Sequence, residues 1–109
     1  MKALKILKAN QIACTGSMFF RTDFSKEQFD RLVAHTIELE IDCPQYFILT
    51  PIPGTVLYER EKPRLVEHNF DLWDFNHAVT PTRLPLKSFY EQYMNAYRTH
   101  LEPFAVALY

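Results

Sequence analysis

Two short segments hold the residues whose types and spacing could position a ligand. Residues 21–23 (Arg-Thr-Asp) and residues 50–55 (Thr-Pro-Ile-Pro-Gly-Thr) each follow an apolar run. Pro51 and Pro53 fix the backbone and remove two amide donors, while Gly54 permits a turn that a side chain would obstruct. Such a rigid, backbone-lined lip suits a flat ligand such as adenine, although an ordinary strand-to-helix turn has the same composition.

Arg21 has two alternative roles. A guanidinium at the end of a strand can bind a carboxylate or a phosphate, but it can also pair with a nearby acid, here Asp23. Arginines in exposed loops more often take the second role, so the sequence favours an Arg21–Asp23 ion pair.

Three residues near the middle of the chain could serve as metal ligands. Asp71, Asp74 and His77 are of types that bind divalent ions, but their spacing matches no known metal motif. Aspartates beside Trp73 and Phe75 usually cap turns and hydrate a loop. We therefore expect no metal site, and a free-standing metalloenzyme is the weakest alternative. A nucleophile elbow, a phosphate-binding Gly-rich loop and a dinucleotide fingerprint are also absent from the sequence.

The chain has two cysteines, Cys14 and Cys43, which are too few and too far apart for a metal knuckle. Nothing in the sequence indicates secretion, where a disulfide would be favoured. We expect two reduced, buried thiols.

The composition is typical of a packed domain rather than of a linker. Of 109 residues, 48% are apolar and 15% aromatic, and the formal net charge is −1. Because there is no run of five like charges, we expect no nucleic-acid partner and no charged lipid-binding patch. No apolar stretch is long enough for a membrane span or a signal peptide, so we expect a cytoplasmic protein.

The elements that must position these residues can be predicted from hydrophobic spacing. Residues 2–9 indicate a short helix. Residues 12–20 indicate a mostly buried strand in which Gly16 admits a close approach to the backbone. Ser25 and Gln28 form a capping box that predicts a helix over residues 25–40, and residues 46–50 read as a second buried strand.

A strand, a helix and a strand at this spacing predict a βαβ unit with parallel strands, whose carboxyl ends open on one side. Residues 55–61 predict a short helix capped by Thr55. Residues 70–77 have no clean period and suggest a loop with at most a brief strand. A last helix is predicted to begin near Pro85, and its aromatic face must pack against the rest of the chain. The residues of this face are Leu86, Phe89, Tyr90, Tyr93, Met94, Tyr97 and Leu101. The predicted fold class is α/β.

Residues 46–58 resemble a segment near the end of the catalytic barrel of radical S-adenosylmethionine enzymes, with the pattern Thr-Pro-x-Pro-Gly-Thr-x-Leu-Tyr. The resemblance continues in register through residues 70–74, residues 77–79 and the helix at 86–97. These segments are similar to members that also carry a cobalamin-binding domain, a subgroup that includes ring cyclases of chlorophyll synthesis and enzymes of hopanoid modification.

The resemblance implies a fragment of a partial (β/α) barrel over residues 1–80, followed by a C-terminal helical extension over residues 81–109. It implies that the parent is an Fe–S oxidoreductase with a [4Fe-4S] cluster and S-adenosylmethionine, with cobalamin as a further cofactor of the subgroup. The family holds its cluster with three cysteines separated by three and then two residues. This chain has no such motif, so we expect no cofactor in this chain and no catalysis by it alone.

The resemblance also implies which positions touch the adenosyl group in the parent. The family has a glycine-rich turn, G-x-I-x-G-x-P-G-x-T, and residues 16–25 keep only its first glycine and its hydrophobic third position, with Phe20 at the second glycine. The positions carried over are Gly16, Met18, Thr50, Pro51, Ile52, Pro53 and Gly54.

Two functional hypotheses follow. In the first, the chain is a fragment whose partner is the missing N-terminal half of the barrel. In the second, it is a stand-alone ligand-binding or oligomerising scaffold. Because a piece of a barrel leaves strand edges unpaired, we expect a homodimer or larger assembly.

Overall fold

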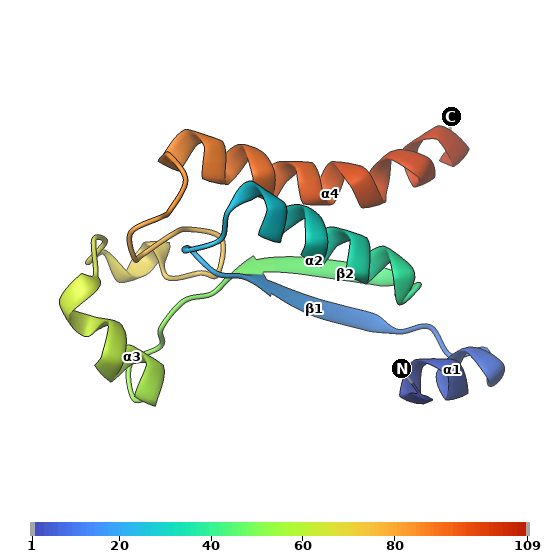
Figure 1. Ribbon diagram of the computed structural model, residues 1–109. Helices are drawn as coiled ribbons and strands as arrows, with labels where there is room; N and C mark the ends of the chain where they lie inside the picture. The colour runs from blue at the N-terminus through green and yellow to red at the C-terminus, as the bar shows by residue number, and fades with distance from the viewer. Residues whose placement is uncertain (1, 109) are drawn as a thin grey trace.

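The computed structural model describes the backbone of residues 2–108 and the side chains of residues 2–99. The helices and strands, in chain order, are α1 (Lys2–Ala9), β1 (Thr15–Phe20), α2 (Lys26–Glu38), β2 (Cys43–Ile48), α3 (Val56–Glu61) and α4 (Leu86–Leu108). Short 3₁₀ turns occupy Lys62–Arg64 and Phe70–Leu72. The second of these lies in the segment expected to be a loop, and no strand forms there (Figure 1).

The central unit is the predicted βαβ arrangement. β1 pairs in parallel with β2, in a register that runs from Thr15 opposite Cys43 to Phe20 opposite Ile48. The capping box at Ser25 forms as predicted: the Gln28 amide donates to Ser25 Oγ, and the Ser25 amide donates to Gln28 Oε1 at 2.8 Å. The predicted α/β class, with a βαβ unit and a C-terminal helix, is confirmed, and it is consistent with a fragment of a barrel.

Both strand boundaries differ from the prediction. β1 begins at Thr15 instead of Ile12, and β2 covers Cys43–Ile48 instead of residues 46–50. Pro44, which has no amide proton, lies inside β2. However, the amides of Cys43 and Leu49 donate toward β1, at Cys14 O and Phe20 O, so alternation directs position 44 to the other edge. A proline there removes no bond between the strands.

One face of the sheet carries the core. Figure 1 shows α2 and α4 on the same side of the two strands. Seven buried residues from these four elements form one cluster: Phe20, Phe29, Tyr46, Ile48, Phe89, Tyr93 and Ala96. Aromatic rings dominate it, with Phe20 stacked on Tyr46 at 5.2 Å and tilted against Phe29 at 4.6 Å between ring centroids. Such contacts add about 0.5–1.5 kcal/mol each to the gain from burial.

The opposite face of the sheet is not covered by any helix of the described chain (Figure 1). Phe19 is 44% exposed there, and its ring contacts Phe47 and Phe75 at 5.6 and 6.0 Å. The prediction that the first strand is mostly buried is therefore wrong, because only alternate side chains, those of Met18 and Phe20, face the helices.

The outer edge of β2 is closed by groups from the second half of the chain. The Tyr46 amide donates to the Tyr97 hydroxyl at 3.1 Å, and Tyr46 O accepts from the hydroxyls of both Tyr93 and Tyr97. The Ile48 amide donates to Phe75 O at 2.7 Å. In contrast, within the described residues the outer edge of β1 has no strand or loop paired to it.

The buried face of α4 is narrower than predicted. Phe89, Tyr93 and Ala96 are buried, whereas Leu86 and Met94 are 56% and 50% exposed. A straight helix packed on a two-stranded sheet buries a strip along one side, so residues on the flanks of the aromatic face stay in solvent. The side chain of Leu101, also assigned to this face, lies outside the described residues. Among the described residues, no helix is both long and apolar enough to cross a membrane.

Candidate functional site

The predicted lip after β2 is a tight turn. The Thr55 amide and hydroxyl both donate to Ile52 O, at 3.2 and 2.7 Å. Pro53 and Gly54 occupy the two central positions, and Gly54 has a φ of +93°. This is the arrangement of a type II turn, which requires positive φ at its third residue and therefore favours glycine. The sequence prediction for Gly54 is confirmed.

The same turn starts α3. Thr55 is the N-cap, and its hydroxyl accepts from the Tyr58 amide at 3.1 Å, as predicted. The Tyr58 ring lies 6.1 Å from Trp73, which attaches the short helix to the following loop. The turn and this aromatic contact together fix the direction in which α3 projects its side chains.

Of the lip residues, Thr50 and Pro51 are buried and Ile52 is 38% exposed. The Thr50 hydroxyl donates back to the carbonyl of Ile48, the last residue of β2, at 3.1 Å. Within the described residues, the amides of Ile52 and Gly54 donate to no backbone or side-chain acceptor that would compete with a ligand. The lip thus offers two amide donors and the apolar surface of Ile52 and the prolines.

Gly16 and Met18 do not lie at the lip. Gly16 is opposite Pro44 near the start of the strands, and Met18 is opposite Tyr46 within them, two residues before the end of β1. The close approach predicted at Gly16 is confirmed, because a Cβ there would lie 2.8 Å from Ile41 Cδ1. Met18 packs against the core on the helix side of the sheet. The structure brings together residues 50–54 but not these two.

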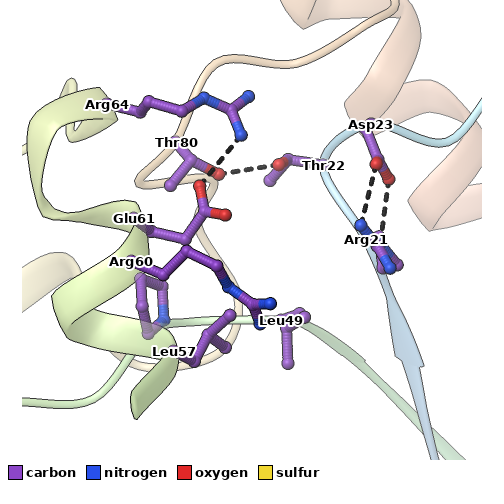
Figure 2. Close-up of a pocket in the computed structure, with 10 residues that line it drawn as sticks. Arg21, Thr22, Asp23, Leu49, Leu57, Arg60, Glu61, Arg64 and Thr80 are labelled. Atoms are coloured by element: carbon purple, nitrogen blue, oxygen red, sulfur yellow. Dashed lines mark hydrogen bonds and ion pairs between the residues drawn. The ribbon is translucent and has the colours of Figure 1, made fainter. Parts of the chain in front are cut away.

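A cavity of about 300 Å³ opens beside the lip, at the carboxyl ends of both strands. Figure 2 shows it between α3 on one side and the loop after β1 on the other. Its lining is Arg21, Thr22, Asp23, Leu49, Pro51, Leu57, Arg60, Glu61, Arg64 and Thr80. Of the predicted lip, only Pro51 reaches it.

Three arginines surround this cavity. Arg21 makes a two-pronged ion pair with Asp23, with Nε and Nη2 at 3.1 and 3.0 Å from the carboxylate oxygens, so the favoured alternative for Arg21 is confirmed. Arg64 Nη1 donates to Glu61 Oε2 at 3.0 Å. Arg60 has no ion pair within the described residues, and Figure 2 shows its guanidinium extending from α3 toward Leu49.

Two buried threonines meet in the wall of the cavity. The hydroxyls of Thr22 and Thr80 lie 2.7 Å apart, 58 positions apart in sequence. The Arg83 amide donates to Thr22 O at 2.9 Å and holds the two segments together. A pair of hydroxyls has two protons and uses one in their mutual bond, so one proton remains to donate elsewhere.

Most of the residues that line this cavity were not predicted from the sequence. Arg60, Glu61, Arg64 and Thr80 were not among the candidate residues. The available signal was local: Arg60 and Arg64 are four residues apart, directly after the lip and its capped helix. Nothing local, however, indicates that the chain returns to place Thr80 against Thr22.

The three residues considered as metal ligands are not gathered into a site. His77 Nδ1 lies 2.9 Å from Asp74 Oδ1, and this hydrogen bond lowers the pKa of the Asp74 carboxyl. Asp71 does not join them, and among the described residues no group of three His, Cys, Asp or Glu side chains is placed to hold a metal ion. Asp74 also accepts from the Asn76 amide at 2.9 Å, which is the turn-capping role.

The two cysteines lie at the opposite end of the sheet from the cavity. Cys43 donates its amide to Cys14 O at 3.2 Å, and both thiols are free. Cys43 is exposed and Cys14 half-buried, so the prediction of buried thiols is wrong. The reason is that Cys14 precedes β1, whereas Cys43 lies by strand alternation on the same face as Phe47, which no helix of the described chain covers.

Comparison with known proteins supports the resemblance found in the sequence. The chain is 28% identical over 104 residues to hopanoid C-3 methylase from Methylococcus capsulatus. The match covers 92% of this chain but 20% of the methylase, so the chain spans about one fifth of the length of that relative. No protein-family model matches the chain, and no solved structure matches it. The name of this relative is that of an enzyme of hopanoid modification, one of the groups in the subgroup that residues 70–74, 77–79 and 86–97 resemble.

Proposed function

We propose that this chain is the C-terminal part of a radical S-adenosylmethionine Fe–S oxidoreductase of the cobalamin-associated subgroup. Residues 1–80 would form the end of its catalytic barrel, and residues 81–109 would form its helical extension. The observation that carries the proposal is the similarity to hopanoid C-3 methylase over 92% of the chain. The lip at residues 50–55 supports it, because the residues that carry the family pattern form one tight turn with Gly54 at positive φ.

Within such a parent, the lip would be a platform for the adenosyl group. The amides of Ile52 and Gly54 can donate to acceptor nitrogens of adenine, and the prolines and Ile52 offer a flat apolar surface. Gly16 and Met18, which lie within β1 and away from the lip, would contribute only by positioning that strand.

The residues present do not fit the iron–sulfur cluster. A [4Fe-4S] cluster is held by cysteine thiolates, three of them in this family's motif, and this chain has two cysteines at the end of the sheet remote from the lip. In the parent, cluster and S-adenosylmethionine together would supply a radical that abstracts a hydrogen from substrate. This chain would supply position and shelter, and it is not expected to be catalytic alone.

Calorimetric titration with S-adenosylmethionine tests whether the lip at residues 50–55 binds the adenosyl group. If the platform works only within the complete barrel, the purified chain gives no saturable heat, and Gly54→Val changes nothing. A full-length parent containing this segment should bind the ligand and lose affinity on the same substitution. A full-length parent that assembles no cluster after anaerobic reconstitution would contradict the proposal.

The alternative is a stand-alone ligand-binding or oligomerising scaffold. The unpaired edge of β1 and the exposed ring of Phe19 favour it, because both are surfaces on which another chain can dock. Saturable binding of S-adenosylmethionine by the purified chain, abolished by Gly54→Val, would favour this alternative over the fragment.

A further inference from the structure

We propose that the cavity between α3 and the loop after β1 binds the oxyanion of a small ligand, a phosphate or a carboxylate. The principal contact is Arg60, and Arg21, Arg64 and the Thr22–Thr80 hydroxyl pair assist it. This site is separate from the adenosyl platform, and it does not depend on the identity of the parent enzyme.

The first support is that three arginines from different segments line the same cavity. Arg60 and Arg64 approach the cavity from α3 and the turn after it, while Arg21 approaches from the end of β1 (Figure 2). Guanidinium groups match carboxylate and phosphate oxygens in planar, two-pronged geometry. A volume of about 300 Å³ is sufficient for such a headgroup and a few attached atoms.

The second support is the number of donors still available. Arg60 has no carboxylate partner within the described residues, and Arg64 uses one guanidinium nitrogen on Glu61. One hydroxyl proton of the Thr22–Thr80 pair is also left over. Because a guanidinium has five N–H donors, these groups keep most of their hydrogen-bonding capacity for a ligand.

The third support is charge. The lining holds three arginines and two acids, Asp23 and Glu61, so it is positive, whereas the whole chain has a formal net charge of −1. The existing ion pairs are half-exposed, with Arg21 and Asp23 side chains 64% and 54% exposed. Such pairs are worth about 0–1 kcal/mol, so an incoming anion can compete for the same arginines.

The test is titration of the ¹⁵N-labelled chain with inorganic phosphate and, separately, with succinate, followed by amide chemical shifts. We expect saturable shifts confined to residues 21–23, 57–64 and 80 with at least one probe. The probe that saturates identifies the headgroup. If sodium chloride at equal ionic strength gives the same shifts, or if neither probe saturates through the millimolar range, the proposal is wrong.

Variants sharpen the test. Arg60→Gln should weaken binding about tenfold or more, which corresponds to the loss of a hydrogen bond to a charged group. Arg31→Gln, on the exposed surface of α2, is the matched control and should leave affinity unchanged. Glu61→Gln should strengthen binding, because it frees Arg64. Equal effects of Arg60→Gln and Arg31→Gln would overturn the proposal.

Discussion

At the scale of single residues, two tyrosine hydroxyls connect α4 to the edge of β2. Tyr93 is 5% exposed, and its hydroxyl lies 2.9 Å from Tyr46 O and 2.7 Å from Asn76 Oδ1. Burial, together with its hydrogen bond to Tyr97, raises the pKa of Tyr93 well above that of an exposed tyrosine. Burial likewise raises the pKa of Tyr46.

These raised pKa values predict a loss of stability at high pH. A tyrosine whose folded pKa exceeds its unfolded value, about 10, contributes its full stabilisation below pH 10 and loses it as the pH rises further. For Tyr93 alone the loss is about 1.4 kcal/mol for each pH unit between its two pKa values. Urea unfolding at pH 8 and pH 11 measures it.

The control for this prediction is Tyr93→Phe. This variant should be about 1–2 kcal/mol less stable at pH 8, because Tyr46 O loses a donor, and should show a smaller decline toward pH 11. An identical decline in both proteins would mean that Tyr93 does not control the pH dependence.

A second prediction concerns Gly54. No heavy atom lies within 4 Å of the Cβ position there, so any penalty for a side chain arises from the positive φ rather than from crowding. We expect Gly54→Ala to lower the free energy of unfolding by about 1–2 kcal/mol and Gly54→Asn by less, since asparagine tolerates this region. Thermal unfolding of both variants measures the difference, and equal losses would exclude the backbone explanation.

At the scale of elements, the sequence predicted the helix caps and the tight turn, because each depends on residues close together in the chain. The capping box at Ser25, the Thr55 cap and the turn at Gly54 all involve residues within three positions of one another, and all three form. β2 starts at Cys43, three residues before the predicted start, because pairing with β1 extends the strand through Pro44, whose missing amide proton faces the other edge. The cavity depends on contacts such as Thr22 with Thr80, 58 positions apart, which no local pattern encodes.

The third prediction concerns the open edge of β1. By strand alternation, the amide of Ser17 points to the outer edge and that of Met18 points to β2. We predict that Ser17→Pro preserves the fold but abolishes self-association, whereas Met18→Pro destabilises the sheet. Circular dichroism and sedimentation of both variants separate the two effects. Retention of the assembly in folded Ser17→Pro would show that the edge is not the contact.

At the scale of the whole molecule, the two faces of the sheet differ in whether helices cover them. Helices α2 and α4 cover one face, while the opposite face leaves Phe19 44% exposed beside Phe47. In a complete barrel, both the edge of β1 and this aromatic face would meet the preceding strands. In the isolated chain, the same surfaces are expected to meet another copy.

The unequal edges set how many copies can join. Tyr97, Tyr93 and Phe75 occupy the amide and carbonyl of Tyr46 and the amide of Ile48 at the outer edge of β2. Within the described residues, the edge of β1 is therefore the one left open to another copy. A chain with one open strand edge can pair with one other copy. When two copies pair through these edges about a two-fold axis, neither has an open edge left. We therefore expect association through the edge of β1 to stop at a dimer with a four-stranded sheet, because the tyrosines of α4 oppose the addition of a further strand at β2.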